Sequence, residues 1–195
     1  MIKNLLVAAA ISTLTSTVAS TAFSAPEQYN LDASHSQIVF SYNHLGYSTT
    51  WGMFSGFNGE ISFDADAPAS STVSVKMPVK SMFTGWEKRF DHFMSDNFLN
   101  ATDETMVSFT STSIEVTGED TAKITGDLTI GSITKSVVLD TKMNKNAMHP
   151  MANKEWLGFD ASTTILRSDF GAGAFAPHVG DELNVLISIE ASKAE

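Results

Sequence analysis

Hydrophobic and polar side chains alternate along several segments of the chain, which is the pattern of β-strands with one buried face. In residues 37–45, Ile38, Phe40, Tyr42 and His44 share one face, and the other face is mainly polar. The same alternation recurs in residues 57–63, 73–79, 124–130, 159–165 and 183–189. Turn-forming residues separate these segments at 64–68, 117–120 and 179–181. Many short strands with polar turns predict an all-β sandwich or barrel.

One stretch follows a helical period instead. Its larger side chains are spaced by three and four positions: Trp86, Phe90, Phe93, Met94 and Asn97. Charged residues fall between them, so we predict a short amphipathic helix that starts near Thr84 or Gly85. A single helix among strands could close one end of a barrel.

The first 24 residues have the features of a secretory signal peptide. Lys3 precedes a compact apolar run at 5–11, and small side chains follow up to Ser24. This run is shorter than the roughly 20 residues that a membrane span needs, which makes a membrane anchor the weaker alternative. We therefore expect residues 1–24 to be removed, residues 25–195 to form a single domain, and the protein to be exported to the periplasm of a Gram-negative cell.

Composition narrows the function further. The chain of 195 residues has a net charge of -10, no Cys and 43% hydrophobic residues. The acidic balance argues against nucleic acid, because phosphate binding needs clustered Lys and Arg. The lack of Cys excludes disulfides, thiolate metal sites and thiol catalysis.

Motifs for catalysis are weak. No two His residues are spaced as metal ligands on one strand or helix face, although a three-His site assembled in space stays open. Asp32, His35 and Ser36 have the residue types of a catalytic triad, but three side chains so close on one extended segment cannot easily face one another. We therefore predict no catalytic residues, no metal and no cofactor, and do not expect an enzyme.

Large aromatic side chains are unusually frequent, with 13 Phe in the chain. Rings on several inward strand faces suit an antiparallel barrel of about eight strands, which can be filled by side chains or can hold one small ligand. The composition does not choose between these two interiors.

An ordered set of motifs resembles the YceI-like family over nearly all of residues 25–195. The set comprises Tyr29-x-x-Asp32-x-x-His35-Ser36, Phe40, His44-x-Gly46, Gly52-x-Phe54, Arg89-x-Asp91-His92, Ser95-Asp96-x-Phe98, Phe109, Gly126-Asp127-Leu128-Thr129-Ile130, Thr134-Lys135, Arg167-Ser168-Asp169-Phe170-Gly171 and Val179-Gly180-Asp181-Glu182. Two departures are Gly131-Ser132, where the family usually has a basic residue and then Gly, and Thr105-Met106, where it commonly has Tyr-Pro.

The resemblance implies an extended, lipocalin-like antiparallel barrel whose apolar tunnel holds a polyisoprenoid or similar amphiphile. Relatives are mostly exported, and some occur beside or fused to membrane cytochromes of the b561 type. On this basis we expect the following side chains to line the tunnel: Phe40, Tyr42, Phe54, Phe83, Phe90, Phe93, Met94, Phe98, Phe109 and Phe159. His44 and Arg167 are candidates for contacts to a polar headgroup, and for Arg167 an ion pair with Asp169 or another acid is the alternative.

Three functional classes follow. The first is a periplasmic carrier of isoprenoids such as quinones or their precursors, in transient contact with a membrane or a b561-type cytochrome. The second is a general binding protein for fatty acids or amides, and the third is an enzyme that acts on such a lipid. A homodimer is also expected, since barrels with apolar rims often associate.

Overall fold

The structure, a computed structural model, describes residues 25–195; the predicted signal peptide lies outside these residues. The described chain forms one antiparallel sheet of ten strands. The strands are β1 (Glu27–Leu31), β2 (Gln37–His44), β3 (Ser48–Phe54), β4 (Asn58–Phe63), β5 (Thr72–Pro78), β6 (Met106–Val116), β7 (Thr121–Ile130), β8 (Ile133–Met148), β9 (Glu155–Leu166) and β10 (Glu182–Lys193). Three short 3-10 helices, η1 (Pro68–Ser70), η2 (Val79–Ser81) and η3 (Ser168–Phe170), and one α-helix, α1 (Glu87–Met94), complete the fold.

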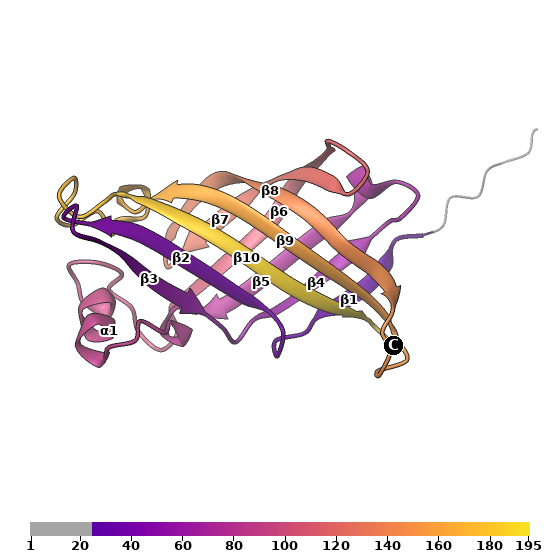
Figure 1. Cartoon of the computed structure of the whole chain (residues 1–195), viewed down its shortest axis with the longest axis horizontal. Helices are drawn as coiled ribbons and strands as arrows, with labels where there is room; N and C mark the ends of the chain where they lie inside the picture. The colour runs from indigo at the N-terminus through magenta and orange to yellow at the C-terminus, as the bar shows by residue number, and fades with distance from the viewer. Residues whose placement is uncertain (1–24) are drawn as a thin grey trace, which may run out of the picture.

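The sheet closes on itself. Its order runs β1-β4-β5-β6-β7-β8-β9-β10, and β10 pairs back to β1 with Lys193 opposite Tyr29. These eight strands form a closed antiparallel barrel, as predicted (Figure 1). The long strand β10 also pairs with β2, where Ile187 lies opposite Ile38. Strands β1 and β2 therefore follow each other along one edge of β10, and β3 extends the sheet beyond β2 at the end of the barrel where α1 lies.

The predicted alternation matches the faces of the strands. On β2 the residues that line the barrel interior are Ile38, Phe40, Tyr42 and His44. On β10 they are Leu183, Val185, Ile187 and Ile189. Because successive side chains of a strand point to opposite faces, each strand contributes every second residue to the interior.

Three buried clusters hold the barrel together. Tyr29, Phe63 and Leu157 centre one cluster between β1, β4 and the start of β9. Phe57, Met77, Val79 and Val107 form a second. Phe40, Tyr42 and Met82 form a third, which partly buried side chains of α1 contact. Full burial of one such large apolar side chain contributes about 1.5–3 kcal/mol, so the barrel has a packed wall even where its interior is hollow.

The helix is present but shorter than predicted, since it starts at Glu87, two residues after Gly85, and ends at Met94, three residues before Asn97. Gly85 has a φ of +74°, a left-handed conformation that favours glycine, and Thr84 Oγ1 donates a hydrogen bond to the carbonyl of Trp86 over 2.8 Å. This turn sets the direction in which α1 leaves the barrel. Phe90, Phe93 and Met94 then pack against the third cluster. The helix therefore lies at one end of the barrel (Figure 1). None of the described helices is long and apolar enough to cross a bilayer.

The two departures from the family pattern fall in ordered turns. Gly131 and Ser132 join β7 to β8 as a two-residue hairpin, with Ile130 paired to Ile133 and Gly131 at a φ of +61°. The carbonyl of Thr105 accepts a hydrogen bond from Val79 N over 2.9 Å. Gly131-Ser132 and Thr105-Met106 are therefore compatible with the turns that lead into β8 and β6.

Candidate functional site

A large cavity occupies the barrel interior. Its volume is about 1120 Å³, and its wall is built from the inward faces of β2 to β10, with side chains of α1 at one end. Small-molecule sites typically occupy about 300–1,000 Å³, so this cavity is slightly larger than that range. Most of the wall is aliphatic or aromatic, which suits a long apolar ligand.

Nine of the twelve predicted site residues line this cavity. They are Phe40, Tyr42, His44, Phe54, Phe93, Phe98, Phe109, Phe159 and Arg167. They come from β2, β3, β6, β9, α1 and the segments that follow α1 and β9, so the fold brings together residues that are far apart in the sequence. Whether each contacts a ligand stays a prediction.

Three predicted residues do not reach the cavity wall. The Phe83 side chain is 66% exposed, and its backbone pairs with Met53 at the edge of β3. Phe90 and Met94 pack against the Phe40, Tyr42 and Met82 cluster and are not among the residues that line the cavity. The helical period identified an apolar face correctly, and of its members Trp86 and Phe93 line the cavity, whereas Phe90 and Met94 do not.

Other lining residues were not selected from the sequence. Leu139 and Met143 of β8 line the cavity, and so does Phe175 in the loop before β10. Strand β8 was missed because Val137 and Val138 are adjacent apolar residues, and only Val137 faces inward. Phe175 was counted in the aromatic surplus, but no periodicity exists in a loop that would have assigned its direction.

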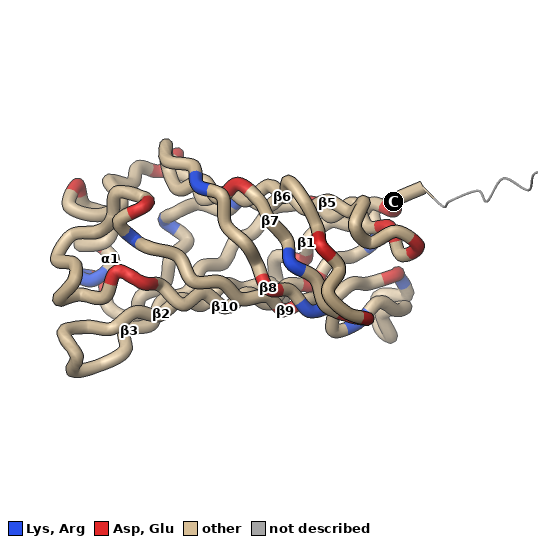
Figure 2. Tube along the Cα trace, turned by 90° about the horizontal axis from the view of Figure 1, so that it is seen from above, with Lys and Arg blue, Asp and Glu red and all other residues tan. Residues whose placement is uncertain are grey.

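Exposed lining residues gather at two ends of the cavity. At the α1 end they include Leu45, Trp86 and Phe175. At the opposite end the cavity reaches Glu119 and Asp120 in the β6–β7 turn. The two ends therefore differ in chemistry: the α1 end combines exposed aromatic side chains with Lys88, Arg89 and His92, whereas the opposite end is acidic. Along the tube of the chain, Figure 2 shows long uncharged stretches of strand and charges of both signs around α1.

Arg167 is a buried cation in the cavity wall. Its Nε donates to the carbonyl of Gly180 over 2.8 Å, and its terminal nitrogens donate to the carbonyls of Ala172, Ala174 and Val179. Burial lowers the pKa of Arg167, while the charge of Asp181 opposes this change. A guanidinium has five N–H donors, and these contacts occupy them.

The alternative prediction for Arg167 was an ion pair with Asp169 or another acid that pins a loop. The partner is wrong, because within residues 25–195 Arg167 forms no ion pair and bonds to backbone carbonyls of the loop. Asp169 lies 3.8 Å from Lys135 Nζ instead. The loop at 172–180 is held through its carbonyl oxygens, so Arg167 is a positioning residue for the loop that carries Phe175. A direct headgroup contact would require Arg167 to release one of those carbonyls.

His44 and Thr141 are polar groups with access to the cavity. His44 ends β2 at the α1 end, where its backbone pairs with Ser48 and Val179. Thr141 Oγ1 is buried in the wall without a hydrogen-bond partner. A ligand hydroxyl or carbonyl could satisfy it, because a buried polar group left unpaired is costly. His44 lies on β2 and Thr141 on β8, and within residues 25–195 these two side chains do not converge as a catalytic pair would.

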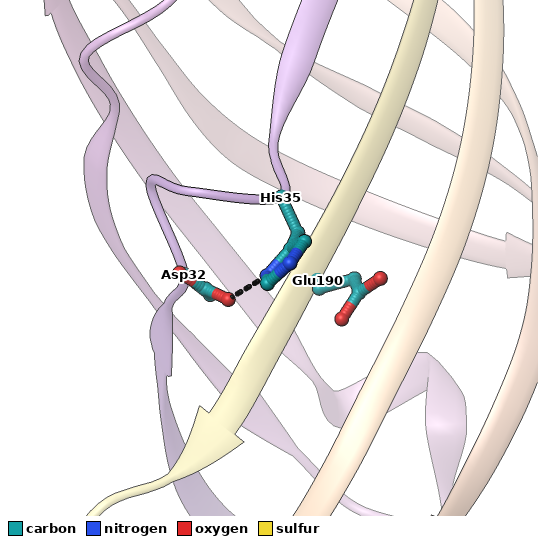
Figure 3. A group of neighbouring side chains, drawn as sticks. All are labelled: Asp32, His35 and Glu190. Carbon is teal, nitrogen blue, oxygen red and sulfur yellow. Dashed lines mark hydrogen bonds and ion pairs between the residues drawn. The ribbon is translucent and has the colours of Figure 1, made fainter.

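The Asp32, His35 and Ser36 motif lies outside the cavity lining, at the corner between β1 and β2 (Figure 3). His35 Nδ1 is 2.5 Å from Asp32 Oδ2, and Glu190 of β10 is the third member of the cluster, with ligand-type atoms of all three within 4.8 Å of one another. Ser34 N and Oγ both donate to Asp32 Oδ1. Glu190 Oε2 accepts a hydrogen bond from Trp156 Nε1 over 2.7 Å.

These contacts change two pKa values. The hydrogen bond with Asp32, and then its charge, raise the pKa of His35. Burial raises the pKa of Asp32, but the hydrogen bonds from Ser34 and His35 together outweigh it, so the pKa of Asp32 is lowered. Ser36 Oγ contacts the backbone of Glu190 rather than His35. The cluster therefore fastens the β1–β2 corner to β10 and does not have the geometry of a triad.

Comparison with known proteins supports the family that the motifs indicate. The YceI-like domain matches residues 29–191. A UPF0312 protein of Ectopseudomonas mendocina is 34% identical over 190 residues, covering 97% of this chain and 98% of the relative. The solved YceI protein of Campylobacter jejuni aligns with a TM-score of 0.69 and 30% identity, over 78% of this chain and 90% of that one.

A third relative is informative for the fold. A polyisoprenoid-binding domain from Saccharophagus degradans aligns with a TM-score of 0.65 and 12% identity, over 85% of this chain and 98% of that one. At that identity the likeness concerns the barrel alone. The family match and the identities to YceI and UPF0312 proteins establish that this chain belongs to the YceI-like domain family.

Proposed function

We propose that the protein is a periplasmic carrier that holds one long-chain isoprenoid, such as a quinone, a quinone precursor or a similar amphiphile. The observation that carries this proposal is the apolar cavity of about 1120 Å³ along the barrel interior. The family membership and the polyisoprenoid-binding relative of the same fold support it. The proposed periplasmic location rests on the signal-peptide pattern of residues 1–24.

The energetics favour exchange over tight capture. Burial of a methylene contributes about 0.8 kcal/mol, so one five-carbon isoprene unit nominally contributes about 3–4 kcal/mol. About eight units would exceed the roughly −20 kcal/mol ceiling on measured affinities, and ordering a flexible tail offsets much of the gain. A free tail would otherwise lie in a bilayer, so the net free energy of transfer from membrane to protein is close to zero. A transfer free energy close to zero suits a carrier that takes up its ligand from membranes and releases it to them.

The same cavity would accept a fatty acid or an amide, which is the second candidate. Its support is the plain apolar wall, which has no feature that selects a branched isoprenoid over a linear chain. An enzymatic function has less support, because His44 and Thr141 do not converge on one point of the cavity. We therefore propose a binding role, with transient contact to a membrane or to a b561-type cytochrome.

Competitive loading tests the proposal. Protein stripped of lipid with organic solvent and refolded would be incubated with vesicles that contain equal amounts of a forty-carbon isoprenoid quinone, oleic acid and oleamide. Native mass spectrometry would then identify the retained molecule. We expect one quinone per chain. Preferential retention of oleic acid or oleamide would favour general lipid binding, and retention of none by a refolded barrel would contradict both binding roles.

A further inference from the structure

Exposed aromatic side chains are confined to one end of the described chain. Five aromatic residues are among its exposed large apolar side chains, and with Leu45 they define the aromatic rim: Leu45, Tyr47, Trp51, Phe83, Trp86 and Phe175. The remaining exposed large apolar residues of residues 25–195 are aliphatic: Val116, Val138, Met148, Met151, Leu166 and Leu186. Monomeric soluble proteins rarely expose large apolar patches without a function.

Three separate segments build the rim around the α1 end of the cavity. The β2–β3 hairpin supplies Leu45 and Tyr47, and the outer face of β3 supplies Trp51. The segment between η2 and α1 supplies Phe83 and Trp86. The loop before β10 supplies Phe175, whose ring centroid is 6.0 Å from that of Phe98. All three segments lie at the same end of the barrel (Figure 1).

The rim is continuous with the cavity. Leu45, Trp86 and Phe175 are largely exposed to solvent and also line the cavity wall. A ligand that enters at this end would therefore pass directly between rim side chains. Whatever covers the rim also covers this opening.

The backbone holds two of the rim residues in an unfavourable conformation. Leu45 has a φ of 56° and Phe175 a φ of 65°, in the left-handed region that bulky residues rarely adopt. The other two non-glycine residues of the described chain with positive φ are both Asn, which tolerates this region well. Backbone strain of this kind often marks a functional surface. Here it holds Leu45 and Phe175 at the opening.

The charges near the rim are mixed. Helix α1 carries Glu87 and Asp91 together with Lys88 and Arg89, and the chain as a whole has a net charge of -10. Such a surface has no electrostatic preference for anionic lipid. Trp and Tyr, by contrast, favour the interface of a bilayer, where an apolar ring and a polar N–H or O–H are both satisfied. The rings of Phe83 and Phe175 add apolar surface that would be buried there.

We infer that the aromatic rim docks on the interfacial region of a lipid bilayer and places the α1 opening of the cavity against the membrane. This inference rests on the proposed carrier function, because the bilayer is the reservoir from which an isoprenoid would load. A second copy of the chain on the same surface would close two cavities against each other, whereas a bilayer provides a continuous apolar path for the ligand. Docking depends on ring insertion and not on charge.

The three Trp residues provide the test. Trp51 and Trp86 belong to the rim, whereas Trp156 lies at the start of β9 and bonds to Glu190. Three variants would each keep one Trp and replace the other two by Phe. Each would be mixed with phosphatidylcholine vesicles whose acyl chains carry bromine close to the headgroup. We expect quenching of Trp51 and Trp86 and none of Trp156. Equal quenching of all three, or of none, would overturn the inference.

Paired variants separate the rim from general hydrophobicity. Tyr47→Ser with Trp86→Ser should reduce partition into neutral vesicles by about tenfold or more, since both lost rings would insert. Met148→Ser with Met151→Ser removes two exposed apolar side chains elsewhere, 56% and 87% exposed, and should leave the partition unchanged. Raising the salt concentration should have little effect. A requirement for anionic lipid, or a dimer in sedimentation that shields Trp51 and Trp86, would contradict docking on a neutral bilayer.

The lipid content of the same samples distinguishes the two proposals. Protein that holds a lipid but shows no quenching would refute the docking surface and leave the carrier function standing. Protein that shows rim quenching but is unable to take up lipid would refute the carrier function and leave the docking surface standing.

Discussion

The guanidinium of Arg167 lies 5.8 Å from the centroid of the Tyr42 ring, in the wall of the cavity. The same guanidinium holds the loop at 172–180 through four carbonyl oxygens. A single side chain from the end of β9 therefore connects an inward residue of β2 to the loop that presents Phe175 at the opening. The stability of that loop and the shape of the α1 end of the cavity depend on one residue.

We predict that Arg167→Lys destabilises the protein by about 2–4 kcal/mol, because an ammonium cannot replace the planar set of donors and would leave buried carbonyls unpaired. Urea unfolding would measure this change. Lys135→Ala serves as the control, since its pair with Asp169 is long and half-exposed and should contribute less than about 0.5 kcal/mol. Equal effects of the two variants would contradict the role assigned to Arg167.

Filling the cavity should abolish lipid binding without unfolding the barrel. Ala161 of β9 lines the cavity, and Ser162 lies next to it on the other face of the strand. Ala161→Phe should prevent loading while it changes the free energy of unfolding by less than about 1.5 kcal/mol, since the ring enters empty space. Ser162→Phe, the matched outward change, should retain lipid. Normal lipid binding by Ala161→Phe, measured by native mass spectrometry, would show that the lipid binds elsewhere.

Two glycines lie under aromatic rings, and their substitution should have unequal effects. A Cβ on Gly52 would lie 2.3 Å from Phe40 Cζ, the far end of a side chain that can move. A Cβ on Gly126 would lie 2.4 Å from Phe109 Cζ and also 2.6 Å from the carbonyl oxygen of Thr110. Gly126→Ala should therefore destabilise the protein more than Gly52→Ala. We expect a loss of about 3 kcal/mol in the free energy of unfolding for Gly126→Ala and of about 1 kcal/mol for Gly52→Ala. Thermal unfolding would rank the two, and the reverse order would show that the backbone of β6 yields more easily than the Phe40 ring.

The pKa of His35 should lie above 6.5, and Asp32→Asn should lower it, because the hydrogen bond and charge of Asp32 are its main causes. Glu190→Gln should lower it less, since Glu190 contributes only a smaller charge effect. Titration of the His35 ring protons by NMR would measure all three values. An unchanged pKa in Asp32→Asn would contradict the pairing.

The same pair predicts a pH dependence of stability. A raised His pKa contributes stability that is fully present below 6.5 and is lost as the pH rises through the folded-state pKa of His35. A lowered Asp pKa contributes stability that is present above 3.8 and is lost as the pH falls through the folded-state pKa of Asp32. The difference in stability between wild type and Asp32→Asn should therefore be largest between these limits, and urea unfolding across the pH range would check it.

The barrel could be predicted from the sequence because apolar and polar residues alternate along strands that have one buried face. Strands β2 and β10 each present four inward side chains at alternate positions, and both were found. Strand β3 was missed, because Trp51 on its outer face is 55% exposed and an exposed ring looks the same in a sequence as a buried one. For the same reason Phe83 was assigned to the cavity although its side chain faces solvent.

The candidate site was only partly predictable. Alternation placed Phe40, Tyr42 and Phe159 inward, and the family resemblance supplied the other lining residues. The partners of Arg167 could not be predicted, because a backbone carbonyl is the same in every residue. The contrast between the α1 end, with its aromatic and basic side chains, and the acidic end depends on which turns meet at each end of the closed barrel. That information lies in the strand order and not in any local motif.

The most direct test of the carrier function is mass spectrometry of the organic extract from protein that has been purified from a periplasmic fraction without denaturation. The proposed function predicts one isoprenoid per chain, and the headgroup would identify the pathway that it serves. A folded protein that yields no lipid would contradict the central claim that the cavity is built to hold one.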